Sequence, residues 1–197
     1  MLADMGEPAL RKATYEDLCQ VPDHLVAEIL AGELHVSPRP ASFHAQASSV
    51  LGVSVGGPFV LGSSGPGGWW ILDEPELHLG EDVLVPDLAG WRRERMPRVP
   101  KVAGFRLAPD WVCEVLSPGT AMRDRAIKMP IYAREGVGHV WLLDPDARTL
   151  EVFRRMEGGW MLVAVHARAV KVRAEPFDAV ELNLGPLWAE EEGGAAP

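Results

Sequence analysis

The sequence predicts a single α/β (α+β) domain, in which helices flank a mixed β-sheet. The central part of the chain has the order helix, three strand-like stretches, helix, strand. The second of these helices, at 119–136, lies between two apolar stretches at 110–116 and 139–144, and a helix that joins two buried strands is typical of a parallel crossover. A chain of 197 residues that is 47% hydrophobic can bury one core of ordinary size.

The N-terminal part predicts a short helix, two strands and a longer helix. Thr14 can cap the first helix because Asp17 stands three positions later, close to the pattern of a capping box. Residues 24–38 alternate like two short strands around a turn at Ala31-Gly32. Residues 41–55 carry apolar side chains at helical spacing, which predicts the longer helix.

The central part predicts the elements of the sheet. Its three strand-like stretches lie at about 69–79, 83–91 and 110–116. The helix at 119–136 contains Pro130, which has no backbone N–H to donate, so a kink or a break is expected there. These elements determine which side chains face one another.

The C-terminal part predicts an extension of the sheet. The stretch at 149–155 is expected to pair back on the strand before it as a β-hairpin arm, and 160–167 to form a further strand. We expect one domain over 1–187, with its core at about 24–155. The segment 188–197 is acidic and rich in small residues, which predicts a disordered tail.

Composition excludes several classes of protein. The net charge of −9 argues against a broad basic surface for nucleic acid, although it leaves room for a local one. Cys19 and Cys113 are far apart and neither lies in a CxxC pair, so a thiolate zinc site is not expected. No secretory pattern is visible, and glycines and a proline interrupt the most apolar region, at about 50–61. We therefore expect a cytoplasmic protein with no membrane partner.

Two acidic residues stand in stretches that otherwise predict buried strands. Glu114 lies within 110–116, and Asp87 lies within 83–91, directly after Pro86. A buried carboxylate without a partner is costly, and two carboxylates on neighbouring strands repel each other unless a cation lies between them. Oxygen ligands of this kind suit Mg²⁺ or Mn²⁺. Lys128, on the helix that follows Glu114, can point back at the pair and position a water molecule.

Each of these residues also has an ordinary structural interpretation. Lys128 follows Asp124 by four residues, which is the spacing of a surface ion pair on a helix. Asp87 can be a turn residue after a proline. Glu114 can form a purely structural pair with Arg123 or Arg125.

The ordered set of motifs resembles the Uma-two family of predicted restriction endonucleases, in the PD-(D/E)xK nuclease superfamily. The matching pieces cover about 24–155 and read "AEILAGELHVSPRP", "VPDLAGW", "WVCEVLSPGT", "RDRAIKMPIYAREGVGHVWLLDP" and "TLEVFRR". The resemblance implies a restriction-endonuclease-like αβββαβ core, with Asp87 and Glu114 as the two acidic residues. The superfamily places a lysine two positions after the second acid, where this chain has Leu116. The resemblance assigns that role to Lys128, as a lysine that has migrated to the next helix.

The resemblance also indicates residues outside this trio. Glu28 matches an acidic position near the start of the family domain and is expected to assist as a metal or water ligand, although a solvent-facing strand residue is the commoner case. Glu76 is a weaker candidate, and His44 matches without an assigned role.

A run of basic residues follows the Asp87 stretch. Arg92, Arg93 and Arg95 are candidate phosphate contacts, and Arg98, Lys101 and Arg106 extend the run. The alternative is an ordinary solvated loop.

The combined expectation is a nuclease that depends on Mg²⁺ or Mn²⁺ and hydrolyses phosphodiester bonds, with DNA as its substrate. Asp87 and Glu114 would hold the metal, and Lys128 and Glu28 would complete the catalytic set. One alternative is a protein that keeps the nuclease fold for binding or assembly without catalysis, since a fold does not determine a function. Another is a hydrolase of nucleotides. A homodimer is also possible, because the C-terminal strands offer a sheet edge.

Overall fold

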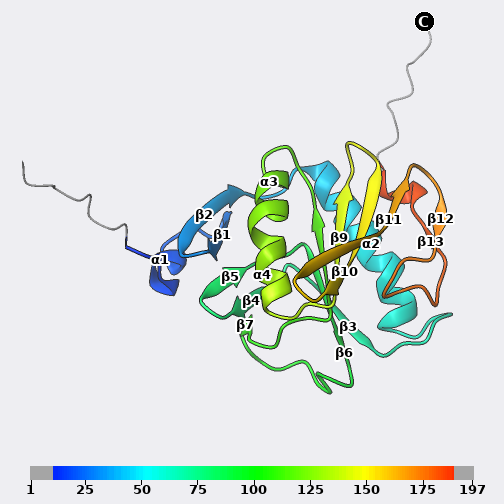
Figure 1. Ribbon diagram of the computed structural model, residues 1–197, viewed down its shortest axis with the longest axis horizontal. Helices are drawn as coiled ribbons and strands as arrows, with labels where there is room; N and C mark the ends of the chain where they lie inside the picture. Colours follow the sequence, from blue (N-terminus) through cyan, green and yellow to red (C-terminus); the bar gives the residue numbers. More distant parts are fainter. Residues whose placement is uncertain (1–10, 189–197) are drawn as a thin grey trace, which may run out of the picture.

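A computed structural model describes residues 11–188. A six-stranded mixed sheet forms the centre of the molecule, and a five-stranded sheet lies beside it (Figure 1). The strand order in the central sheet is β11-β10-β9-β8-β6-β3. Its strands are β3 (Trp69–Asp73), β6 (Leu88–Arg92), β8 (Trp111–Val115), β9 (His139–Asp144), β10 (Thr149–Met156) and β11 (Gly159–Ala167).

The smaller sheet has the order β2-β1-β5-β4-β7. Its strands are β1 (Leu25–Leu30), β2 (Glu33–Pro38), β4 (Glu76–Leu79), β5 (Asp82–Leu84) and β7 (Gly104–Phe105), and a separate short pair consists of β12 (Lys171–Val172) and β13 (Leu182–Asn183). The remaining helices outside the crossover are α1 (Tyr15–Cys19), α2 (Ser42–Phe59) and the 3₁₀ turn η2 (Gly185–Leu187). Thr14 caps α1 in a capping box with Asp17, as the sequence predicts.

Two of the predicted strands are wrong in their extent. The stretch 69–79 is divided between β3 and β4, and the stretch 83–91 is divided between β5 and β6, so each runs from one sheet into the other. Asp87 therefore lies in the link between β5 and β6, not inside a strand. Removing β4, β5 and β7, which belong to the smaller sheet, leaves α2, β3, β6, β8, the crossover helix and β9, which is the expected αβββαβ core.

Pro86 explains the break in the second stretch. β6 pairs with β8 in antiparallel register from Gly90↔Trp111 to Leu88↔Cys113. Continuing this register would place Pro86 opposite Val115, and a proline has no N–H to donate to the ladder. The chain leaves the sheet at this point, and the side chain of Asp87 bonds to the N–H of Val115 instead.

The predicted crossover is confirmed. β8 and β9 are parallel, and the connecting helix consists of α3 (Ala121–Arg123), the π-helical turn η1 (Asp124–Lys128) and α4 (Met129–Arg134). Pro130 stands at the start of α4, and the N–H of Met129 bonds to the carbonyl of Asp124, one residue further back than in an α-helix. The expected irregularity at Pro130 thus takes the form of a π-turn.

The central sheet separates two hydrophobic clusters, and this explains the direction of Glu114. Trp111, Cys113 and Val115 of β8 join the cluster that contains α2, whereas Val112 and Leu116 join the cluster beneath the crossover helix. Because side chains alternate along a strand, Glu114 faces the crossover helix.

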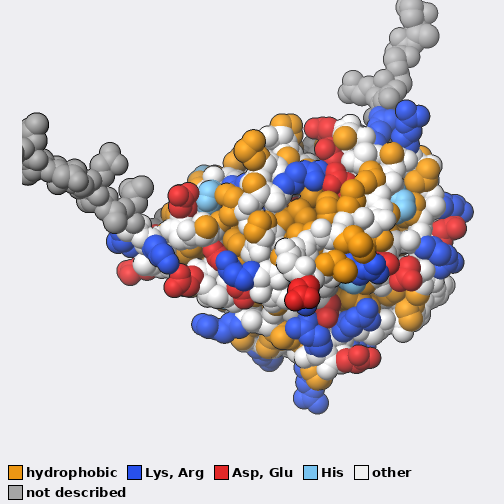
Figure 2. Space-filling view, in the orientation of Figure 1, with side chains coloured by type: hydrophobic (Ala, Val, Ile, Leu, Met, Phe, Trp, Pro, Cys, Tyr) orange, Lys and Arg blue, Asp and Glu red, His pale blue; other side chains and the backbone are white. Residues whose placement is uncertain are grey.

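The C-terminal hairpin is confirmed as β10 paired with β11, which extends the central sheet to its edge. Leu162 and Val165 of β11 are exposed, and Figure 2 shows hydrophobic side chains gathered over this hairpin. Pairing of a second copy at this edge stays a prediction. Trp188, assigned by the sequence to the tail, is buried in the core, and 189–197 lies outside the described residues. Among the described residues, no helix has the length and apolar character that crossing a membrane requires.

Candidate active site

The four candidate catalytic side chains line one pocket of about 70 Å³ between the two sheets and the crossover helix. Glu28 comes from β1, Asp87 from the link after β5, Glu114 from β8 and Lys128 from η1. The break between β5 and β6 places Asp87 at this junction. Asp87, Glu114 and Lys128, expected from the strand pattern, and Glu28, expected from the resemblance, are far apart in sequence and meet in the fold.

Lys128 lies at the centre of the acidic residues. Its ammonium group is 2.9 Å from Glu114 and 2.9 Å from Oε1 of Glu28, and its side chain is only 3% exposed. It also donates to the carbonyl of Val85 at 3.3 Å, and Asp124 lies 3.8 Å away on the same helix. The Lys128–Asp124 pair has the spacing of a surface ion pair, but both side chains are buried.

Glu114 has two donors. Lys128 donates to its Oε2 at 2.9 Å, and the hydroxyl of Tyr132 donates to its Oε1 at 2.5 Å. All three side chains are buried, so these bonds are shielded from water. The alternative partners of Glu114 are wrong, because Arg123 approaches Glu28 and bonds to Ser37, while Arg125 makes a paired bond with Glu151.

Glu28 connects the smaller sheet to the site. Its Oε1 accepts the N–H of Val85 at 2.9 Å, and the guanidinium of Arg123 lies 3.9 Å from its Oε2. Val85 thus has its N–H bonded to Glu28 and its carbonyl bonded to Lys128. The side chains of Glu28 and Lys128 thus supply hydrogen-bond partners for a backbone segment that Pro86 keeps out of the sheet. The solvent-facing interpretation of Glu28 is wrong, because the residue is 3% exposed.

Asp87 and His44 are held against the end of β8. Oδ2 of Asp87 accepts the N–H of Val115 at 2.7 Å, and Nε2 of His44 lies 2.6 Å from the carbonyl oxygen of Val115 and 3.4 Å from Oδ1 of Asp87. Since the carbonyl can only accept, Nε2 carries the hydrogen. No role for His44 followed from the sequence, and the structure places it beside Asp87.

Burial dominates the protonation of these groups. It raises the pKa of Asp87 to about 6, against the lowering effect of His44 and of the N–H of Val115. It also raises the pKa of Glu114 and Asp124, against the opposing effect of Lys128. Burial lowers the pKa of Lys128, but Glu114, Glu28 and Asp124 together raise it above its ordinary value, so Lys128 stays charged.

The donor set fits a hard divalent cation in its chemistry. Carboxylates outnumber cations in the pocket, and burial raises the pKa of Asp87, Glu114 and Asp124, so further positive charge would favour their ionised forms. Within residues 11–188, no three His, Cys, Asp or Glu side chains are arranged as a metal cage. Mg²⁺ commonly binds through one or two carboxylates together with waters and substrate phosphates, so an all-protein cage is not required.

Comparisons with known proteins identify the family of the chain. A family model described as "Putative restriction endonuclease", Uma2, matches residues 13–185. The chain belongs to the Uma2 family. The expected family resemblance is therefore confirmed over most of the chain.

A solved structure shares the Uma2 chain's fold. It is a crystal structure of a "putative nuclease belonging to DUF820" from Anabaena variabilis, with a TM-score of 0.70 and 24% sequence identity. The match covers 89% of this chain and 97% of that one. The expected restriction-endonuclease-like fold is confirmed. No curated protein matches the sequence.

The structure does not bring the remaining sequence candidates of this Uma2 chain into the pocket. Glu76 accepts a bond from Tyr15 and pairs with His78. Arg92 and Arg93 lie over the rings of Trp69 and Trp70, and Arg95 pairs with Asp110. β6 explains the separation, because Asp87 precedes its first residue and Arg92 is its last.

Tyr132 and Asp124 were missed as site residues. A signal existed in the sequence: 124, 128 and 132 follow one another at intervals of four, which places them on one face of a helix. The sequence does not predict whether that face of the helix points towards Glu114, because the rotation of the helix depends on the π-turn at 124–128.

Proposed function

We propose that this Uma2 chain is a nuclease that depends on Mg²⁺ or Mn²⁺ and hydrolyses phosphodiester bonds in DNA. One observation carries the proposal: Lys128 contacts Glu114 and Glu28 at 2.9 Å each, in the pocket that Asp87 also lines. Family membership and the name of the structural neighbour support it.

Each residue has a role that follows from its contacts. Asp87 and Glu114 would hold the metal, with Glu28 assisting. When bound, the metal would polarise the phosphoryl oxygen and lower the pKa of a water. Lys128 keeps its charge, so it can orient the attacking water and neutralise charge that develops on the phosphate. His44 and the N–H of Val115 keep Asp87 directed into the pocket.

A second candidate function rests on a specific observation. Both oxygens of Glu114 already accept bonds, one from Lys128 and one from Tyr132. A carboxylate whose oxygens are both hydrogen-bonded within the protein can serve only to stabilise the fold. In that case the protein would use the nuclease fold for binding or assembly, without catalysis. This alternative predicts a bound ligand without cleavage.

The deciding experiment is a cleavage assay with plasmid DNA, linear duplex DNA and RNA, each with Mg²⁺, with Mn²⁺ and with EDTA. We expect metal-dependent cleavage of DNA that Asp87→Asn abolishes. Asp73→Asn is the matched control, because Asp73 is an exposed carboxylate on β3 outside the pocket. Undiminished cleavage by Asp87→Asn would sink the assignment. Absence of cleavage by the unmodified protein on every polymer would favour the second candidate.

A further inference from the structure

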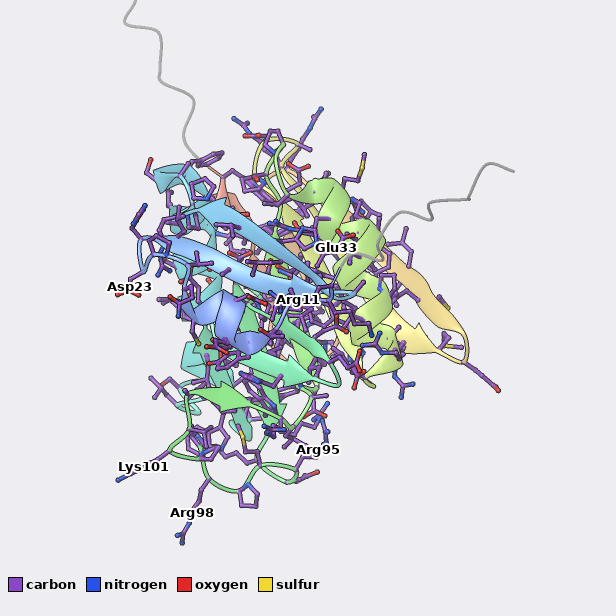
Figure 3. All side chains as sticks on the ribbon, turned by 90° about the vertical axis from the view of Figure 1, so that its left-hand side faces the viewer. Arg11, Asp23, Glu33, Arg95, Arg98 and Lys101 are labelled. Atoms are coloured by element: carbon purple, nitrogen blue, oxygen red, sulfur yellow. The ribbon has the colours of Figure 1, made fainter. Side chains whose placement is uncertain are left out.

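A basic segment protrudes from the end of the molecule. Residues 97–103, "PRVPKVA", are all exposed and contain Arg98 and Lys101 but no acidic residue, in a protein of net charge −9. We call this segment the basic arm. Figure 3 shows Arg98 and Lys101 at its tip, with both side chains directed away from the body of the protein.

The basic arm is fixed at both ends. Met96, before it, is buried, and its carbonyl accepts a bond from the indole of Trp70 at 2.9 Å. Phe105, after it, is buried against Trp91. Two prolines within the arm restrict its backbone. The arm therefore presents its charges from an ordered base, at a low entropic cost of binding.

The charges of the arm are available to a ligand, unlike those of its neighbours. Arg92, Arg93 and Arg95 are each engaged with a ring or a carboxylate of the protein. Within residues 11–188, Arg98 and Lys101 make no hydrogen bond or ion pair. The expected phosphate contacts thus fit the tip of the loop better than its start.

The position of the arm relates it to the pocket. The five residues of β6 lie between Asp87 and the start of the loop. At about 3.4 Å per residue, this separates Asp87 from Arg92 by about 17 Å. Duplex DNA rises about 3.4 Å along its axis for each phosphate of one strand, so a separation of about 17 Å along that axis corresponds to about five nucleotides. The basic arm follows Arg92 in the chain, and Figure 3 shows its tip at the end of the molecule.

We propose that Arg98 and Lys101 bind the phosphate backbone of DNA away from the phosphate in the pocket, at a separation on the order of five nucleotides along the duplex. The inference rests on the proposed function, because it takes nucleic acid as the ligand. The pocket is acidic and the protein as a whole is negative, so a polyanion is repelled by most of the surface. A separate cationic contact can hold the polymer while one phosphate reaches the carboxylates.

The test measures binding without cleavage. Affinity for a 30-base-pair fluorescent duplex is determined in EDTA at several NaCl concentrations, with the full chain, for the unmodified protein and for R98A/K101A. The control is R155A/K171A, which removes two other exposed cations and changes the net charge equally. The slope of log K against log[NaCl] is negative, and its magnitude is expected to be smaller by about 1.8 in the arm variant, with roughly 60-fold weaker binding at 0.1 M salt. The control is expected to keep the slope.

The outcomes separate this inference from the nuclease proposal. An equal loss in both variants would mean that only net charge matters, and it would overturn the arm. An unchanged slope in the arm variant, or no binding of duplex by the unmodified protein, would overturn it as well. If only the arm variant loses affinity for duplex DNA and the unmodified protein cleaves nothing, the role of the basic arm in binding is supported and the nuclease proposal is overturned. If Asp87→Asn abolishes cleavage but R98A/K101A binds duplex as the unmodified protein does, the nuclease proposal is supported and the role of the basic arm is overturned.

Discussion

The ammonium of Lys128 donates to Oε2 of Glu114 at 2.9 Å, although the two residues are 14 positions apart and belong to a helix and a strand. This bond provides the partner that a carboxylate inside a buried strand requires. A buried ion pair stabilises a fold weakly relative to apolar side chains of the same volume, because desolvation offsets the attraction. The retention of charge at this point therefore favours a functional role for the pair.

Removal of Lys128 should destabilise the protein strongly. Lys128→Met leaves Glu28, Glu114 and Asp124 buried without the central cation, which typically costs about 3–5 kcal/mol at neutral pH. The loss should shrink towards pH 4, because burial raises the pKa of Glu114 and Asp124 and both take up protons as the pH falls. Urea unfolding at pH 8 and pH 4 measures both. Lys12→Met is the control, since Lys12 pairs with Glu81 in full exposure, and it should show no measurable loss. An equal loss at both pH values would contradict the charge argument.

Tyr132 should act as a positioning residue for Glu114. Tyr132→Phe removes a buried bond to a carboxylate and should cost about 1.5–3 kcal/mol of stability. If Glu114 is catalytic, kcat should fall by about tenfold with KM little changed, because a freed carboxylate samples more orientations. Tyr15→Phe is the matched control: its hydroxyl donates to Glu76 at 2.8 Å outside the pocket. Equal effects of the two variants on kcat would argue against positioning.

The sequence predicts the crossover better than it predicts the sheets. The parallel β8–β9 pair follows from two buried stretches around a helix, and both clusters confirm it. The division of 69–79 and 83–91 between two sheets was not predicted, because the apolar residues on either side of each break do not show which sheet buries them. Pro86 was the available signal, since a central strand excludes proline.

The site was predictable in its residue types and less so in its contacts. Asp87, Glu114 and Lys128 follow from the pattern of buried strands and the helix after them, the resemblance adds Glu28, and all four line one pocket. The direct partners of Glu114 were open on sequence alone, because Arg123, Arg125 and Lys128 all follow it on one helix. Only the rotation of that helix, with its π-turn, selects Lys128 and Tyr132.

Stability should fall as pH rises through about 6, because the pKa of Asp87 is about 6 in the folded protein against 3.8 ordinarily. Between those values the folded state binds a proton that the unfolded state does not, so its stabilising effect is complete at low pH and is lost above pH 6. Asp87→Asn should remove this loss and stabilise the protein by up to about 3 kcal/mol at pH 8, with no gain at pH 3.5. Unfolding free energies across pH 3.5–8 decide it. A variant that is less stable at pH 8 would contradict the burial argument.

Divalent metal should stabilise the protein through the same carboxylate. Mg²⁺ or Mn²⁺ at about 100 times its dissociation constant would add about 2.7 kcal/mol, and thermal unfolding with and without metal measures this independently of cleavage. Asp87→Asn should lose the effect, whereas Asp73→Asn should keep it. Stabilisation of equal size in the Asp87 variant would place the metal elsewhere.

His44 should control the pH at which Asp87 becomes ionised. It lies 3.4 Å from Oδ1 of Asp87 and lowers the pKa of that carboxyl. His44→Ala should therefore raise the pKa of Asp87 above its value of about 6 and move the lower limb of the profile of kcat/KM against pH to higher pH. His44→Gln retains an N–H that can donate to the carbonyl of Val115, so it separates loss of that bond from loss of the ring. A fall in kcat/KM that is uniform across pH in both variants would show that His44 supports the end of β8 without influencing Asp87.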